Sequence, residues 1–187
     1  RQRQMCIRDS SKSGYEDWVR EHFTELDEAK LGVLLYLFDN RFSIVTGGPG
    51  TGKTYTLEKI LQVYQHWLPT KKVYLAAPTG KAAKRMGQSI SSDLIEIYRA
   101  PTTIPKMREA HWDGTVRRPQ KRKLTADLVI IDEASMVDID LFYHVLKALK
   151  NDSQLVLLGD HHQLESVEAG SLLGDLCSIG AKSNQLR

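Results

Sequence analysis

The segment GGPGTGKT, residues 47–54, is the feature of this sequence that most constrains its fold. It follows an apolar, β-rich run at 42–46 and precedes a helical pattern at 54–67. Its form, G-x-x-x-x-G-K-[ST], is that of a phosphate-binding loop, which requires a strand before it and a helix after it. Glycines let successive backbone N–H groups turn toward one anion, and the dipole of the following helix adds positive potential. The sequence therefore predicts a nucleoside triphosphate site on an α/β scaffold.

The whole loop is expected to bind ATP. Its residues are Gly47, Gly48, Pro49, Gly50, Thr51, Gly52, Lys53 and Thr54. Lys53 supplies a mobile positive charge for the β- and γ-phosphates, and the Thr54 hydroxyl is suited to Mg²⁺. A glycine-rich turn that carries GKT by chance is the alternative, and the strand and helix patterns on either side make it a poor one.

The scaffold is predicted from four apolar runs that lack polar alternation, as strands buried on both faces do. They lie at 42–46, 73–77, 128–132 and 155–159. Helical patterns occur between them and before the first, at 15–38, 54–67, 80–98 and 139–149. This alternation predicts right-handed βαβ units in a three-layer α/β domain with a mostly parallel sheet. The proline-bearing, basic stretch 101–123 is expected to be a loop or insertion, with a solvated loop favoured over a nucleic-acid contact.

Composition narrows the function classes. A chain of 187 residues suits one domain, and a net charge of +3 permits a polyanionic partner without requiring one. The two cysteines, Cys6 and Cys177, lie at opposite ends, which predicts no disulfide framework or zinc site and fits a reducing cytoplasm. The longest apolar run, at 31–38, is far shorter than the roughly 20 residues of a membrane span.

The chain is expected to be a fragment with an atypical beginning. Residues 1–14 contain the string QMCIRDS, which looks like translated adapter sequence, so they are expected to be non-native or disordered. The folded domain is expected to be 15–187.

Two further strand ends carry side chains suited to nucleotide and polymer chemistry. Asp132 ends the third run and Glu133 follows it directly. The Asp132 carboxylate can hold Mg²⁺, and the Glu133 carboxylate can polarise an attacking water. An ordinary acidic helix N-terminus is the alternative for this pair. After the second run come Pro78, Thr79, Gly80 and Lys81, a second helix start that attracts anions. Ligands of such sheets bind at these ends, so a polymer of phosphates, most simply single-stranded nucleic acid, is predicted, against the alternative of a basic solvent-facing helix.

Four segments together resemble one family. GGPGTGKT, LAAPTGKAAKRM, LVIIDEASMVD and LVLLGDHHQLESVEAGSLLGDLC occur in the order and style of superfamily 1 DNA helicases, and more narrowly of the RecD group, the alpha subunits of exodeoxyribonuclease V. The resemblance implies a RecA-like P-loop NTPase lobe of a motor that moves 5′→3′ along single-stranded DNA. It also implies a role in recombinational double-strand break repair with other subunits of an exodeoxyribonuclease V-type complex.

The resemblance also implies roles for individual residues. Pro78, Thr79 and Gly80 match the motif that contacts the DNA backbone. Asp132 and Glu133 match the magnesium ligand and the catalytic acid, and Gln163 matches the glutamine that senses the γ-phosphate and couples hydrolysis to DNA. Contact between Gln163 and the γ-phosphate requires strand 155–159 to lie beside strand 42–46.

The sequence departs from the family in three respects. Lys30 stands where the family has an adenine-reading glutamine, which predicts either weaker base selectivity or loss of the true glutamine in the atypical N-terminus. Residues 103–107 replace a conserved DNA-contacting segment of the family, so no contact is expected there. The chain lacks the second RecA-like lobe, which in the family supplies arginines to the transition state, so the lobe alone is expected to be inactive.

Three other hypotheses remain at this point. The chain is a P-loop ATPase that switches or loads another protein, or it is a non-hydrolysing interaction subunit, which its complete set of Lys53, Asp132, Glu133 and Gln163 disfavours. A metal site at 160–162, Asp-His-His, is disfavoured because adjacent histidines in a loop need a distant third ligand.

Overall fold

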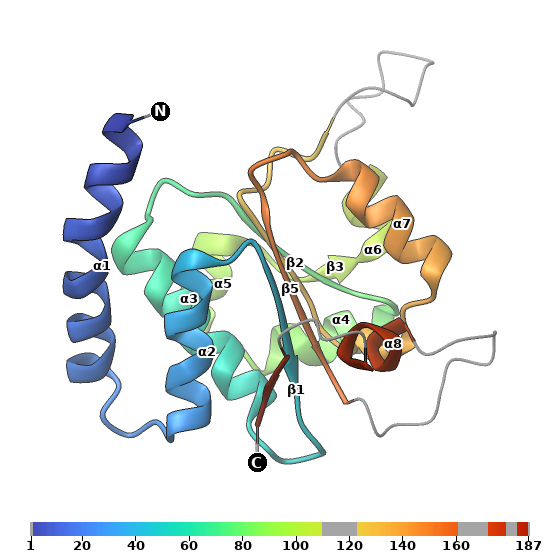
Figure 1. The fold of residues 1–187 in the computed structure, drawn as a ribbon. Coiled ribbons are helices and arrows are strands. Elements are labelled where there is room, and N and C mark those ends of the chain that lie inside the picture. The colour runs from blue at the N-terminus through green and yellow to red at the C-terminus, as the bar shows by residue number, and fades with distance from the viewer. Residues whose placement is uncertain (1, 110–122, 161–171, 179–182, 187) are drawn as a thin grey trace.

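The computed structural model describes residues 2–109, 123–160, 172–178 and 183–186, and Figure 1 shows their arrangement. Within these residues, six parallel strands form one sheet in the order β3-β2-β4-β5-β1-β6. The strands are β1 (Phe42–Thr46), β2 (Val73–Ala77), β3 (Thr102–Thr103), β4 (Leu128–Ile131), β5 (Gln154–Gly159) and β6 (Ser183–Gln185).

Helices cover both faces of the sheet. They are α1 (Gln2–His22), α2 (Glu28–Asp39), α3 (Lys53–Trp67), α4 (Gly80–Gln88), α5 (Ser92–Tyr98), α6 (Ile104–Glu109), α7 (Ile139–Ala148) and α8 (Leu172–Ser178), with a 3₁₀ turn, η1, at Ala134–Met136. Helices α1, α2, α3 and α5 lie on one side, and α6, α7 and α8 lie on the other (Figure 1). In the described part of the chain, no helix is both long and apolar enough to cross a membrane.

Alternate residues of each strand enter different halves of the core. In β4, Leu128 and Ile130 pack in the cluster under α1–α3, whereas Val129 and Ile131 pack in the cluster under α6 and α7. All four side chains are fully buried. Because side chains alternate along a strand, an uninterrupted apolar run is what a sheet covered on both faces needs. The three-layer α/β prediction is confirmed.

The predicted neighbour relation between two strands is also confirmed. β5 pairs with β1 in parallel, in a register that runs from Phe42 opposite Leu155 to Thr46 opposite Gly159. The amide of Gly47 then donates to the Gly159 carbonyl at 3.3 Å, so the start of the phosphate loop is attached to the end of β5.

Two predicted helices are each two helices in the structure. The pattern at 15–38 is broken between His22 and Glu28, where Asp27 takes an extended backbone conformation and its carboxylate caps α2 by accepting from the Lys30 amide. The connector still buries Phe23 and Leu26, which explains why the apolar pattern continues across the break. The pattern at 80–98 is similarly divided into α4 and α5. The expectation that residues 1–14 are non-native or disordered stays a prediction.

The stretch 101–123, expected to be a loop or insertion, begins with regular structure. Thr102 and Thr103 form β3 beside β2, and α6 follows at once. Ile104 and Met107, one helical turn apart, are fully buried, and this burial fixes the short helix. Pro105 stands in the first turn, where a missing N–H costs no helical hydrogen bond.

A contact at Gly159 joins β5 to η1, the turn that follows β4. A Cβ atom at Gly159 would lie 3.1 Å from the Ser135 backbone nitrogen, 3.4 Å from that of Ala134 and 2.7 Å from Leu173 Cδ2. The backbone atoms belong to a packed turn and cannot yield as a flexible side chain does. The close approach of these two elements therefore depends on glycine.

Replacing Gly159 with alanine is expected to lower the free energy of unfolding by about 1–3 kcal/mol, because the added methyl group overpacks a fixed backbone contact. Urea denaturation measures this. Gly32→Ala is the matched control, since a Cβ at Gly32 meets nothing within 4 Å and the residue lies in α2. That variant should be neutral or more stable by up to about 1 kcal/mol. Equal effects of the two substitutions would contradict the role given to Gly159.

Candidate nucleotide-binding site

The loop between β1 and α3 has the backbone geometry of an anion cradle. Gly50 and Gly52 have φ values of 77° and 84°, in the left-handed region that favours glycine. The first intrahelical hydrogen bond of α3 runs from the Thr56 amide to the Gly52 carbonyl at 2.8 Å. The amides of residues 53–55 precede this bond and are therefore available to an anion, as at other helix N-termini.

The ammonium of Lys53 lies against the loop itself. Its Nζ donates to the carbonyl of Gly47 at 2.6 Å and to that of Gly48 at 2.8 Å. Both are neutral acceptors, and charge-assisted bonds to phosphate oxygens are stronger than bonds to carbonyls. The loop and Lys53 thus fit a triphosphate.

Asp132 continues the line of β4 into the site. Its amide donates to the Ala76 carbonyl at 3.0 Å, and its Oδ1 accepts from the Glu133 amide at 2.9 Å. Burial raises the pKa of Asp132 above its ordinary value, and the negative charge of Glu133 adds to the shift. The hydrogen bond from the Glu133 amide opposes it, as do the charges of Lys53 and Arg85. A carboxylate that burial destabilises to this degree fits a bound cation, which would favour its ionised form.

Glu133 stands in a conformation that non-glycine residues seldom adopt. Its φ is 54° and its ψ 40°, and it forms the N-cap of η1. Such backbone strain persists where the surrounding structure enforces it, often at functional sites. Glu133 Oε1 accepts a hydrogen bond from Arg85 Nη1 of α4 at 3.5 Å.

One cavity of about 390 Å³ contains these groups. Its lining residues are Pro49, Gly50, Gly52, Lys53, Thr54, Arg85, Met86, Ser89, Asp132 and Glu133. Three structural units contribute to it, namely the phosphate loop, the end of β4 and the last part of α4. The sequence-predicted ATP and magnesium residues are thus brought together at the carboxyl edge of the sheet.

The predicted DNA-contacting residues follow β2 and lie at the same carboxyl edge of the sheet as this cavity. Thr79 caps α4 by accepting from the Ala82 amide at 3.2 Å. Thr79, Gly80 and Lys81 are exposed, and the amides of Gly80 and Lys81 precede the first intrahelical bond, from Ala83 to Thr79. The exposed start of α4 therefore has the donors that a phosphate backbone needs.

Gln163, together with His161 and His162, lies outside the described residues. Asp160 is described and is 3% exposed. Among the described residues, no group of three or more potential metal ligands occurs. The role predicted for Gln163 stays a prediction, with its strand in the required place.

Comparison with known proteins identifies the family. A family model described as an AAA domain matches residues 34–169, which is most of the chain. The chain belongs to the AAA domain family.

Two curated relatives show which proteins this AAA domain resembles in sequence. It is 38% identical over 154 residues to the RecBCD enzyme subunit RecD of Haemophilus influenzae, covering 74% of this chain and 24% of the relative. It is 32% identical over 161 residues to the ATP-dependent RecD2 DNA helicase of Deinococcus radiodurans, covering 84% of this chain and 21% of the relative. The chain thus spans about a quarter of the length of these curated relatives.

Solved structures agree on the fold. The Pif1 helicase of Candida albicans superimposes with a TM-score of 0.56 at 24% identity, over 86% of this chain and 39% of that one. The AAA domain is RecD-like in sequence and has the RecA-like P-loop fold.

Near the nucleotide loop of the AAA domain the structure places Arg85, to which sequence reasoning gave no individual role, and Lys30, which it had singled out. Arg85 lines the cavity, and its spacing from Lys81, i to i+4, places both on one face of α4. Lys30 forms an ion pair with Asp27, and its Cε would lie 3.0 Å from a Cβ atom at Gly52. The position of Lys30 beside the loop is established, and weaker base selectivity stays a prediction.

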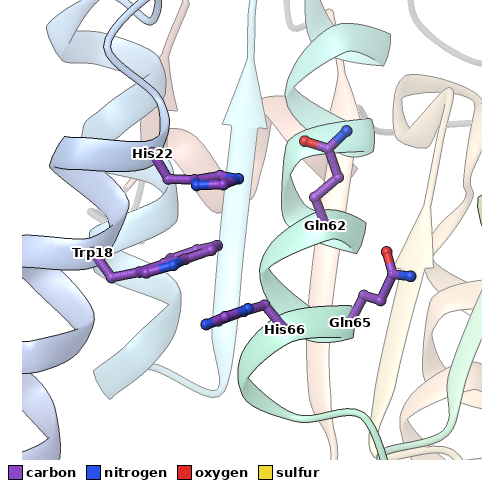
Figure 2. Close-up of a pocket in the computed structure, with 5 residues that line it drawn as sticks. All are labelled: Trp18, His22, Gln62, Gln65 and His66. Atoms are coloured by element: carbon purple, nitrogen blue, oxygen red, sulfur yellow. The ribbon is translucent and has the colours of Figure 1, made fainter.

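A second cavity, of about 400 Å³, lies between α1 and α3 (Figure 2). Trp18 stacks on His22 and on His66, with ring centroids 4.6 and 4.2 Å apart, so both faces of the indole are covered. His66 is thirteen residues beyond Lys53, roughly 20 Å along the helix. This cavity is therefore remote from the phosphate loop, and its stacked rings join α1 to α3 rather than offering a free ring face to a ligand.

Asp132→Asn is expected to stabilise the fold of the AAA domain while weakening its Mg²⁺-dependent binding of ATP. The amide keeps the acceptor for the Glu133 amide and removes a carboxylate whose ionised form burial disfavours. Because the pKa of Asp132 is raised in the folded state, its ionisation at higher pH lowers the free energy of unfolding. The variant should therefore melt at a higher temperature than the wild type at pH 8, and this difference should disappear on acidification.

The same variant should lose the Mg²⁺-dependent part of its ATP affinity. A fluorescent ATP analogue titrated with Mg²⁺ or with EDTA measures this, and the wild-type protein should also lose Mg²⁺ dependence as Asp132 becomes protonated on acidification. If Asp132→Asn retained the full Mg²⁺ dependence of ATP binding, Asp132 would not be a ligand of the metal ion.

Proposed function

We propose that this AAA domain is the first RecA-like lobe of an ATP-dependent DNA helicase of RecD type. In this function, ATP hydrolysis drives 5′→3′ translocation along single-stranded DNA during recombinational double-strand break repair. The relatives named RecBCD enzyme subunit RecD and ATP-dependent RecD2 DNA helicase support this assignment.

The observation that carries the proposal is the position of α4. Its exposed start, at Thr79–Lys81, presents amides and a cation at the carboxyl edge of β2. Its later residues, including Arg85, line the same cavity as Lys53 and Glu133. One short helix thus connects a surface suited to a phosphate backbone with the groups suited to a triphosphate, which is the connection that a DNA-driven ATPase requires.

The chemistry assigned to the site is hydrolysis of the γ-phosphate. A water oxygen attacks the γ-phosphorus, the bond from that phosphorus to the β–γ bridging oxygen breaks, and ADP leaves. Glu133 accepts the proton of the attacking water, and Lys53 stabilises charge on the β- and γ-phosphates. Mg²⁺, held by Thr54 and Asp132, would neutralise phosphate charge. The amides of residues 53–55, which precede the first intrahelical hydrogen bond of α3, orient the triphosphate.

The remaining assignments follow from the same proposal. Gln163 senses the γ-phosphate and relays the nucleotide state to the DNA edge formed by Pro78, Thr79, Gly80 and Lys81. The partners are single-stranded DNA and the other subunits of an exodeoxyribonuclease V-type complex, in the cytoplasm. A second lobe, in the longer protein, closes on the nucleotide and contributes arginines to the transition state.

The 187-residue chain alone is expected to bind ATP–Mg²⁺ weakly and to hydrolyse it negligibly, with or without DNA, because one lobe supplies half of the nucleotide site. An arginine from a second lobe is worth about 10³–10⁵ in rate where such residues have been measured. A coupled ADP-release assay with Lys53→Ala as the background control measures the turnover. Robust DNA-stimulated turnover by the isolated chain would show that the second lobe is dispensable.

The DNA assignment is tested in the two-lobe protein with Lys81→Ala. The variant should bind an oligo-dT more weakly, and loss of one phosphate contact should reduce the slope of log K against log salt by about 0.7. Lys72→Ala is the charge-matched control, because Lys72 is exposed and directly precedes β2, at the opposite edge of the sheet. If wild-type ATPase does not respond to DNA, the domain is a switch or loader for another protein instead.

A further inference from the structure

The ion pair between Arg85 and Glu133 spans two parts of the site that the proposed function must connect. Arg85 belongs to α4, whose start faces outward at the sheet edge, and Glu133 follows β4. The Nη1–Oε1 distance is 3.5 Å, with 80% of the Arg85 side chain and 25% of the Glu133 side chain exposed. Both residues line the cavity that also contains Lys53 and Asp132.

Two features determine the position of the Glu133 carboxylate. The left-handed backbone at Glu133 fixes the start of its side chain, and within the described residues its one ion pair is with Arg85. An oxygen that accepts from the guanidinium does not accept from a water in the same direction. Glu133 is therefore engaged by a neighbour in the lobe without DNA, rather than directed only by its own rotamer.

The guanidinium of Arg85 is also within the reach of a second anion. Lys81 lies one turn earlier on the same face of α4, and both side chains are exposed. An ion pair as exposed as Arg85–Glu133 is weak, because solvent screens it and two mobile side chains must be held. A phosphodiester accepts two parallel hydrogen bonds from a guanidinium, a stronger arrangement. A DNA phosphate near the start of α4 is thus able to compete for Arg85.

We propose that Arg85 is a positioning residue that restrains Glu133 in the DNA-free lobe and releases it when the DNA backbone takes over its guanidinium. This proposal rests on the proposed function and adds to it a physical link from DNA to the catalytic carboxylate. The link runs through α4 and needs no change in the fold. It acts by exchange of one anionic partner of Arg85 for another.

A direct contact of Arg85 with the γ-phosphate is the competing role, and kinetics separates the two. A residue that binds the triphosphate raises the KM for ATP when it is removed. A residue that restrains Glu133 leaves KM nearly unchanged, and its removal raises the DNA-free kcat.

The test uses the two-lobe protein with Arg85→Ala, Arg85→Lys and the control Lys72→Ala, assayed with and without an oligo-dT. Arg85→Ala should raise the DNA-free kcat about three- to tenfold, keep the KM for ATP within twofold, and reduce the ratio of DNA-stimulated to basal rate by at least threefold. Arg85→Lys should restore part of that ratio, since an ammonium pairs with a carboxylate or phosphate but not bidentately. Lys72→Ala should match the wild type.

Four outcomes overturn the proposal. A DNA-free kcat that is unchanged or lower in Arg85→Ala would show that Arg85 does not restrain Glu133. A KM for ATP raised fivefold or more would show that Arg85 binds the triphosphate. A wild-type enzyme without DNA stimulation overturns the proposed function and this inference together, whereas a DNA-stimulated wild type with a normal Arg85→Ala variant overturns the inference alone. Thermal melting of each variant checks the fold, which an exposed side chain is not expected to affect.

Discussion

The parallel pairing of β1 with β5 is the constraint on which the rest of the site depends. It brings the carbonyl of Gly159 within reach of the Gly47 amide, where the phosphate loop starts. Because Gly159 has no side chain, the backbone of Ser135 approaches to a distance at which a Cβ atom would be crowded. One glycine thus brings together the strand, the phosphate loop and the turn after the two carboxylates. Side chains from three chain segments share one edge because the strands beneath them are parallel and closely spaced.

Charge compensation governs the site without ligand. Lys53 rests on loop carbonyls, Arg85 pairs with Glu133, and Asp132 has a pKa raised chiefly by burial. Each of these arrangements is weaker than the one a triphosphate, a cation or a phosphodiester would offer to the same group. In the ligand-free site the charged side chains therefore have weak partners within the protein. Ligand binding would replace these partners with stronger ones from the ligand.

The sequence predicted those parts of the molecule in which local chemistry and tertiary structure agree. The phosphate loop and the four central strands were correct because buried parallel strands and a glycine-rich anion loop have few alternatives. The place of β5 beside β1 was correct because the family resemblance required it for Gln163. The helix break at Asp27, the helix α6 with its buried Ile104 and Met107, and the edge strands β3 and β6 were missed. Each depends on a distant partner, and strands of two or three residues carry almost no periodic signal. The Arg85–Glu133 pair likewise joins segments 48 residues apart.

The attachment of α3 at both of its ends has a mechanical consequence. Near its start, Tyr55 and Lys59 bind Glu25 of the connector between α1 and α2, at 3.1 and 3.0 Å, and near its end His66 stacks on Trp18 of α1. A helix held at two points so far apart resists both tilting and bending. In the proposed motor, a displacement at the phosphate loop would therefore move α3 together with α1 and the connector to which it is attached. The stacked rings of Trp18 and His66 would keep the far end of α3 fixed to α1 during such a displacement.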